Sequence, residues 1–128
     1  MPFFGIFDGH NGDGCSLFIE KNIVDFIVKD FNFPVYPKQA IMNACHKLEK
    51  EFYCSSINKN GNLVDESGSC IIFALIIGNI CYIANIGDSR AFCSRKDGQI
   101  IETITKDHKP EEESEKKRIL KNGGIIYK

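Results

Sequence analysis

The sequence lacks an excess of charge of either sign: 16 Lys and Arg residues stand against 17 Asp and Glu residues, for a formal net charge of −1. A nearly neutral chain has no general electrostatic attraction to nucleic acid or to an anionic membrane. The N-terminus also lacks the basic start and the long apolar core of a signal peptide. These absences predict no nucleic-acid partner and no membrane partner, and they favour a cytoplasmic protein, with the nucleus as the alternative.

Paired cysteine motifs are missing too. The six cysteines stand at positions 15, 45, 54, 70, 81 and 93, and no two have the C-x-x-C spacing of a zinc knuckle. Without a signal for export, we expect reduced thiols. The chain also shows no internal repeat and no low-complexity linker. Its 128 residues, 43% hydrophobic and 26% charged, therefore fit one modest domain.

One uncharged run, CIIFALIIGNICYIANIG at residues 70–87, is nearly long enough to cross a membrane. A β-hairpin is favoured instead, because the run is rich in β-branched residues and Gly78-Asn79 interrupts it as a turn would. We therefore interpret it as two strands, 69–77 and 80–86. Both are apolar at consecutive positions, which predicts a sheet covered on both faces.

The other periodicities complete an α/β pattern. Apolar residues at three- and four-residue spacing predict a helix over about 14–30 and a second helix whose inner face runs from Ile41 to Phe52. The short turns Gly87-Asp88 and Asp97-Gly98 favour antiparallel neighbours. We expect a largely antiparallel sheet or sandwich with paired helices outside. The remaining predicted elements are a buried strand at 3–7, strands at 89–95 and 99–105, a charged helix at 111–122 and the start of a strand at 125–127.

The first strand ends by presenting three different chemical groups, in FFGIFDGHNG. Asp8 offers a hard carboxylate oxygen, the donor that Mg²⁺ and Mn²⁺ prefer. Gly9 permits a sharp turn and leaves its carbonyl accessible. His10 is the side chain best suited to proton transfer near neutral pH. By itself, this triplet fits an ordinary Asp-Gly turn as well as a metal or acid–base site.

Three later motifs bear on this choice: SGSC at 67–70, ANIGDSRAF at 84–92 and TKDHKPEEESEKKRILKNGGII at 105–126. Together with FFGIFDGHNG, their order and spacing resemble the metal-dependent (PPM-type, type 2C) serine/threonine protein phosphatases. Four linked motifs are far more specific than any one of them. The resemblance covers essentially the whole chain. It implies an antiparallel β-sandwich flanked by antiparallel helix pairs, in α-β-β-α layers, of which this chain carries a part.

The resemblance also implies roles for single residues. Asp8 corresponds to an aspartate that bridges two metal ions, Mg²⁺ or Mn²⁺, and Gly9 to a residue whose main-chain oxygen binds one of them. His10 corresponds to a histidine that protonates the leaving serine or threonine oxygen. Asp88 corresponds to an aspartate of a weaker third metal site, although Gly87-Asp88 alone fits a tight turn equally well. A metal-activated water would then hydrolyse phosphoserine or phosphothreonine in a protein substrate.

Further motif residues have expected structural roles. Arg90 should pair with a nearby carboxylate, and Asp107 and His108 should anchor a loop. Asn11 stands where the family commonly has glycine, and asparagine tolerates a left-handed backbone better than most residues. Cys70 replaces a threonine, and we expect it to fit a buried strand as a small hydrophobe.

Parts of the family pattern are missing from residues 1–128. An arginine and an acidic residue should precede the first strand, and further metal-binding aspartates should follow residue 128. We therefore expect a partial phosphatase domain that is inactive by itself and whose uncovered apolar faces promote self-association. Two alternatives stay open: a catalytically inactive phosphatase-like regulatory or binding module, and an unrelated α/β protein that carries these turns by chance.

Overall fold

The computed structural model describes residues 1–127. β1, β2 and β3 form an antiparallel sheet with β2 in the centre, and β4 and β5 form a separate antiparallel ribbon. The predicted α/β class with antiparallel strands is confirmed. In chain order, the elements are β1 (Phe3–His10), α1 (Gly14–Val28), α2 (Pro37–Ser55), β2 (Gly68–Ile77), β3 (Ile80–Ile86), β4 (Phe92–Arg95), β5 (Ile100–Thr103) and α3 (Glu113–Lys121).

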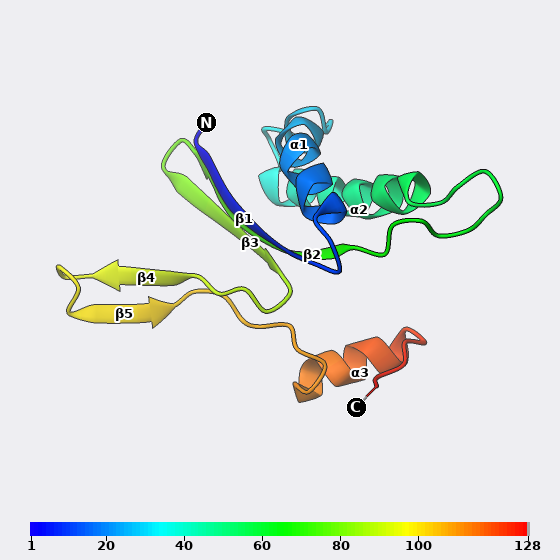
Figure 1. Cartoon of the computed structure of the whole chain (residues 1–128). Coiled ribbons are helices and arrows are strands. Elements are labelled where there is room, and N and C mark those ends of the chain that lie inside the picture. Colours follow the sequence, from blue (N-terminus) through cyan, green and yellow to red (C-terminus); the bar gives the residue numbers. More distant parts are fainter. Residues whose placement is uncertain (128) are drawn as a thin grey trace.

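The core lies between the helix pair and one face of the three-stranded sheet (Figure 1). The inner faces of α1 and α2 follow the predicted three- and four-residue spacing, which places their apolar residues on one side. Phe3 of β1 packs on Phe73 of β2 with ring centroids 4.9 Å apart. The buried cluster consists of Ile19, Ile23, Ile27, Ala40, Ile41, Ala44, Leu48, Ile71, Phe73 and Leu75.

The uncharged run at 70–87 forms the predicted hairpin. β2 and β3 pair from Ile71 with Ile86 to Ile77 with Ile80, and Gly78-Asn79 make the turn between them. Gly78 has a φ of 57°, a left-handed conformation that glycine adopts without steric cost. Within residues 1–127, no helix combines the length and the apolar character needed to span a membrane.

The second face of the three-stranded sheet is uncovered, so the prediction of a sheet covered on both faces is wrong for the described residues. Phe4, Ile6 and Ile83 are 66%, 69% and 41% exposed on that side. The β4–β5 ribbon and α3 extend away from the sheet instead of packing on it (Figure 1). The continuous apolar pattern of β2 reflects its central position, because neighbouring strands shield both of its edges. Ile72, for example, is only 9% exposed.

Three further expectations differ from the structure. The first strand continues beyond residue 7 to His10, because residues 8–10 pair with the start of β2. β3 and β4 are not neighbours, since the connection at 87–91 passes the chain from one sheet to the other. The prediction from the short Gly87-Asp88 turn, that the strands on either side of it are antiparallel neighbours, is therefore wrong. Residues 125–127 form no strand, and within the described chain they have no partner to pair with.

Candidate functional site

The register of β1 and β2 brings two of the motifs together. Asp8 is paired with Cys70, and His10 is paired with Gly68. Alternate residues of a strand point to the same face, so Asp8 and His10 leave β1 on one side and Gly9 on the other. Both side chains belong to exposed residues. The carboxylate of Asp8 is therefore accessible from solvent at the end of the strand.

Asp88 reaches the same place from the connection between β3 and β4. The thiol of Cys70 donates a hydrogen bond to Asp88 Oδ1, with Sγ and Oδ1 3.4 Å apart. Gly87, with a φ of 103°, packs so closely on Cys70 that a Cβ there would collide with Sγ. Cys70 is therefore the strand partner of Asp8 and a side-chain neighbour of Asp88. Cys70 lies in the central strand β2, as expected of a small side chain there, and its half-buried thiol also makes this polar contact.

His10 sits against the backbone of β2. Its imidazole occupies the space beside Gly68, where a Cβ would collide with Nε2. The ring borders a hollow that α2 also lines, through Leu48 and Phe52. Within residues 1–127, the His10 side chain makes no hydrogen bond and no ion pair. Its Nε2 edge faces the backbone of Gly68.

The turn after β1 depends on close packing against α1. Gly9 faces the helix, and a Cβ at this position would lie 2.8 Å from Ser16 Oγ. Asn11 has a φ of 56°, so it adopts the left-handed conformation expected of an asparagine in place of glycine. Gly12 follows with a φ of 119°. These backbone angles fold the chain back from the strand end into α1.

The first residue of SGSC has a role that the sequence does not reveal. Ser67 Oγ accepts a hydrogen bond of 2.9 Å from the backbone N–H of Cys15, in the first turn of α1. The helix's own N-cap residue, Asp13, makes no side-chain capping bond. Ser67 in turn donates its backbone N–H to Asp65 Oδ1 at 2.9 Å, and its hydrogen bonds lower the pKa of the Asp65 carboxyl. The segment before β2 therefore caps a helix 52 residues earlier in the chain.

The DHKP segment, residues 107–110, anchors the connection at 87–91 that carries Asp88. Arg90 donates two hydrogen bonds to Asp107, from Nε to Oδ1 at 2.8 Å and from Nη2 to Oδ2 at 2.6 Å. These bonds, together with the Arg90 charge, hold the pKa of Asp107 below its ordinary value. The backbone N–H of His108 donates to the Gly87 carbonyl at 2.9 Å. The predicted structural roles of Arg90, Asp107 and His108 are confirmed.

A cation beside Asp88 was missed by sequence reasoning. Lys109 Nζ lies 3.9 Å from Asp88 Oδ2 and 3.7 Å from Asp107 Oδ2. Nothing in the spacing of the residues signals this contact, because it depends on how two loops dock. The one feature of the sequence that could have pointed to Lys109 is its place in the DHKP motif, directly after the anchoring residues Asp107 and His108.

The oxygen donors at the site are of the kind that hard divalent cations prefer. Asp8 and Asp88 each supply a carboxylate, and carboxylate oxygens suit Mg²⁺ and Mn²⁺. Within residues 1–127, however, no three His, Cys, Asp or Glu side chains gather closely enough to hold a metal ion among themselves. The residues present therefore fit one part of a cation's coordination shell.

Comparisons with a family model and with curated proteins point to the same family. The family model described as protein phosphatase 2C matches residues 1–128. The chain is 44% identical over 125 residues to "Probable protein phosphatase 2C 27" of Arabidopsis thaliana, which covers 98% of this chain and 31% of that protein. It is 37% identical over 135 residues to "Probable protein phosphatase 2C 6" of Paramecium tetraurelia, which covers 98% of this chain and 45% of that protein. The chain thus spans less than half the length of these curated relatives.

Solved structures share the fold. The serine-threonine phosphatase 2C from Toxoplasma gondii superposes with a TM-score of 0.77 at 25% identity, over 98% of this chain and 46% of that one. A sex determining protein of C. elegans superposes with a TM-score of 0.79 at 20% identity, over 98% of this chain and 31% of that one. The second likeness concerns the fold alone.

Proposed function

This chain belongs to the protein phosphatase 2C family, and from that premise we propose that it forms part of a metal-dependent protein serine/threonine phosphatase. Its substrates would be phosphoserine and phosphothreonine in proteins, and its products a free hydroxyl side chain and inorganic phosphate. The observation that supports this best is that Cys70 is the strand partner of Asp8 and the hydrogen-bond partner of Asp88, two residues from motifs far apart in the sequence.

We assign cation binding to the carboxylates of Asp8 and Asp88 and to the main-chain oxygen of Gly9. Bound Mg²⁺ or Mn²⁺ would supply a hydroxide near neutral pH and neutralise charge on the phosphoryl oxygens. Asp8 can hold its ligand rigidly, because the pairing of β1 with β2 fixes its backbone. Gly9 keeps that strand end tight against α1, through its close approach to Ser16.

His10 is assigned as the general acid. It leaves β1 on the same face as Asp8, two residues further along, and no described residue holds its ring nitrogens by a hydrogen bond. A protonated imidazole there can donate to the serine or threonine oxygen as that oxygen departs. Proton transfer of this kind contributes about a hundredfold or more to a rate.

The isolated 128-residue chain should release little or no phosphate from a phosphothreonine peptide in the presence of Mn²⁺. Two carboxylates and one carbonyl are too few donors to hold two hard cations tightly. The measurement is phosphate release with and without Mn²⁺. Strong Mn²⁺-dependent release that Asp8→Ala abolishes would contradict this expectation while supporting the assignment of Asp8.

The activity itself is tested in a chimera in which this chain replaces the matching segment of the Toxoplasma gondii phosphatase. We expect Mn²⁺-dependent phosphate release by the chimera, its abolition by Asp8→Ala, and a loss of about a hundredfold or more on His10→Asn. Glu20→Ala, which removes an exposed carboxylate from α1, is the matched control and should leave the rate unchanged. An active chimera that is indifferent to Asp8→Ala would refute the assigned site.

A non-catalytic phosphatase-like binding module is the second candidate. It is favoured by one observation, that the described residues 1–127 gather no three metal-ligating side chains. The same chimera separates the two functions. A chimera with native circular dichroism and no Mn²⁺-dependent release would favour the binding module over the enzyme.

A further inference from the structure

The two oxygens of Asp88 have different neighbours. Oδ1 accepts the hydrogen bond from the Cys70 thiol, and Oδ2 faces the ammonium of Lys109 at 3.9 Å. The side chains of Lys109 and Asp88 are 46% and 53% exposed, so both can be reached from solvent. The thiol is fixed to its strand, whereas the ammonium lies at the end of a long, flexible side chain. Oδ2 is therefore the oxygen that an incoming cation can take.

Lys109 is held near Asp88 by a second carboxylate. Its Nζ lies 3.7 Å from Asp107 Oδ2. Asp107 is only 13% exposed and is clamped by the two hydrogen bonds from Arg90, so its position is set by the fold. Arg90 already neutralises Asp107. Within residues 1–127, Lys109 is the one ion-pair partner of Asp88.

We propose that Lys109 is a built-in counter-cation of Asp88, whose ammonium stands 3.9 Å from Oδ2 and opposes the binding of divalent cations to that oxygen. This inference rests on the proposed function, since it concerns one of the assigned cation ligands. An ammonium next to the carboxylate offsets the negative charge that attracts a metal ion. Repulsion from a cation at Oδ2 would shift the ammonium away, and Asp107, 3.7 Å from Nζ, can keep it nearby.

The expected signature is a gain in affinity on removing the charge. Lys109→Met should tighten Mn²⁺ binding by roughly twofold to fivefold at low ionic strength, the range expected for a half-exposed ion pair. Lys109→Arg keeps the charge and should stay near the wild-type affinity. The difference between wild type and Lys109→Met should shrink as salt is added, because salt screens exposed charges.

The experiment measures Mn²⁺ affinity of the purified chain by the enhancement of water-proton relaxation, with circular dichroism as a check that each variant is folded. Asp88→Asn is compared with wild type to test whether Asp88 binds the ion at all. Lys106→Met is the matched control for Lys109→Met. It removes a lysine from the same segment, but Lys106 Nζ is hydrogen-bonded to Ser114 Oγ at 2.9 Å.

The outcomes separate this inference from the proposed function. Weaker binding in Asp88→Asn, tighter binding in Lys109→Met and no change in Lys106→Met would support both. Weaker binding in Asp88→Asn without a gain in Lys109→Met, or with an equal gain in Lys106→Met, would overturn the counter-cation and leave the Asp88 site standing. An Asp88→Asn variant that binds Mn²⁺ like wild type, or a wild type that binds none, would overturn the Asp88 site and the counter-cation with it.

Discussion

At the scale of single residues, the SGSC motif joins three parts of the chain. Ser67 caps α1, Gly68 leaves room for the ring of His10, and Cys70 contacts Asp88. Each contact depends on a different property of the residue: the hydroxyl acceptor of Ser67, the missing Cβ of Gly68 and the small polarisable thiol of Cys70. The motif is therefore a point of assembly, at which the FDGH turn and the GDSR connection are both positioned.

Ser67→Ala should destabilise the fold by about 1 kcal/mol, the usual cost of losing a helix cap. The backbone N–H of Cys15 would lose its acceptor. The measurement is urea unfolding followed by circular dichroism, with a lower midpoint and an unchanged slope. Ser55→Ala is the control, because the Ser55 hydroxyl bonds only the Phe52 carbonyl at the exposed end of α2. Equal midpoints for the two variants would contradict the capping role.

At the scale of elements, the site depends on contacts between two loops, the connection after β3 and the segment after β5. The connection after β3 carries Asp88, and the segment after β5 holds it through the Arg90–Asp107 pair and the bond from His108 to Gly87. Asn85 adds a hydrogen bond from Nδ2 to the Lys106 carbonyl at 3.0 Å. β3 and β4 belong to different sheets, so strand pairing does not fix the connection between them. These hydrogen bonds and the ion pair fix it instead.

The Arg90–Asp107 pair should make stability depend on acid. Hydrogen bonds from Arg90, aided by the charges of Arg90 and Lys109, lower the Asp107 pKa in the folded state from its ordinary value of 3.8. The pair therefore stabilises the fold above pH 3.8, and this contribution is lost as the pH falls below 3.8 through the folded-state pKa. Asp107→Asn should lower the free energy of unfolding at neutral pH and reduce its loss in acid.

Urea unfolding from neutral pH to below 3.8 checks this dependence. Asp97→Asn is the matched control, since Asp97 lies in the exposed β4–β5 turn, and its acid dependence should equal that of wild type. An Asp107→Asn variant that keeps the full wild-type acid dependence would show that the pair contributes nothing to folding.

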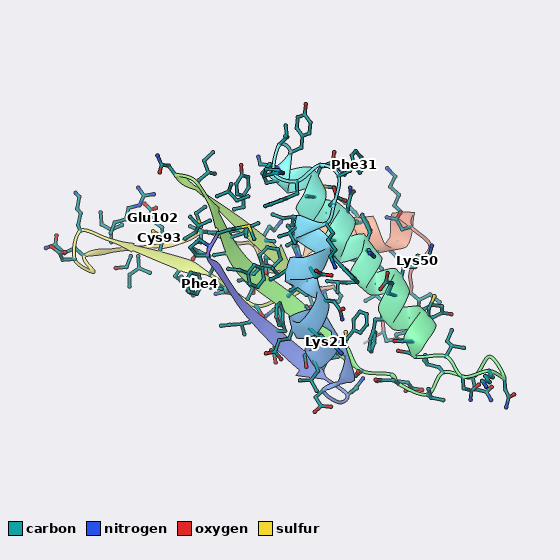
Figure 2. The ribbon with its side chains drawn as sticks, turned by 90° about the horizontal axis from the view of Figure 1, so that it is seen from above. Phe4, Lys21, Phe31, Lys50, Cys93 and Glu102 are labelled. Carbon is teal, nitrogen blue, oxygen red and sulfur yellow. The ribbon has the colours of Figure 1, made fainter. Side chains whose placement is uncertain are left out.

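At the scale of the whole molecule, the helix pair covers one face of the three-stranded sheet and leaves the other open. That face carries exposed Phe4, Ile6 and Ile83, and β1 and β3 are edge strands. Exposed apolar faces and unpaired strand edges favour association between molecules. In Figure 2, Phe4 on β1 lies far from Phe31, which stands in the turn between α1 and α2.

We predict that the chain self-associates through the open face. Phe4→Lys should reduce association, because it places a charge among the exposed apolar residues. Sedimentation velocity at increasing concentration is the measurement. Phe31→Lys is the control, because Phe31 is 91% exposed but lies away from that face, and it should leave association unchanged. A monodisperse wild-type monomer at every concentration would rule the prediction out.

Local patterns in the sequence were sufficient for much of the fold. The spacing of Ile19, Ile23 and Ile27 predicted the buried face of α1, and Gly78-Asn79 predicted the turn of the β2–β3 hairpin. These features depend on residues close together in the chain, whose periodicity and turn chemistry act locally. The motifs likewise predicted which side chains to look for, Asp8 and Asp88 among them.

Only the tertiary structure decided which distant groups meet. The sequence determined that Asp8 ends a strand and that Asp88 follows one. The register of β1 on β2 placed Cys70 opposite Asp8, and the docking of the DHKP segment placed Lys109 beside Asp88, which also contacts Cys70. The open face of the sheet and the separation of β3 from β4 were decided in the same way. The physical reason is that strand register, loop docking and burial depend on contacts between residues remote in the chain, which no local pattern encodes.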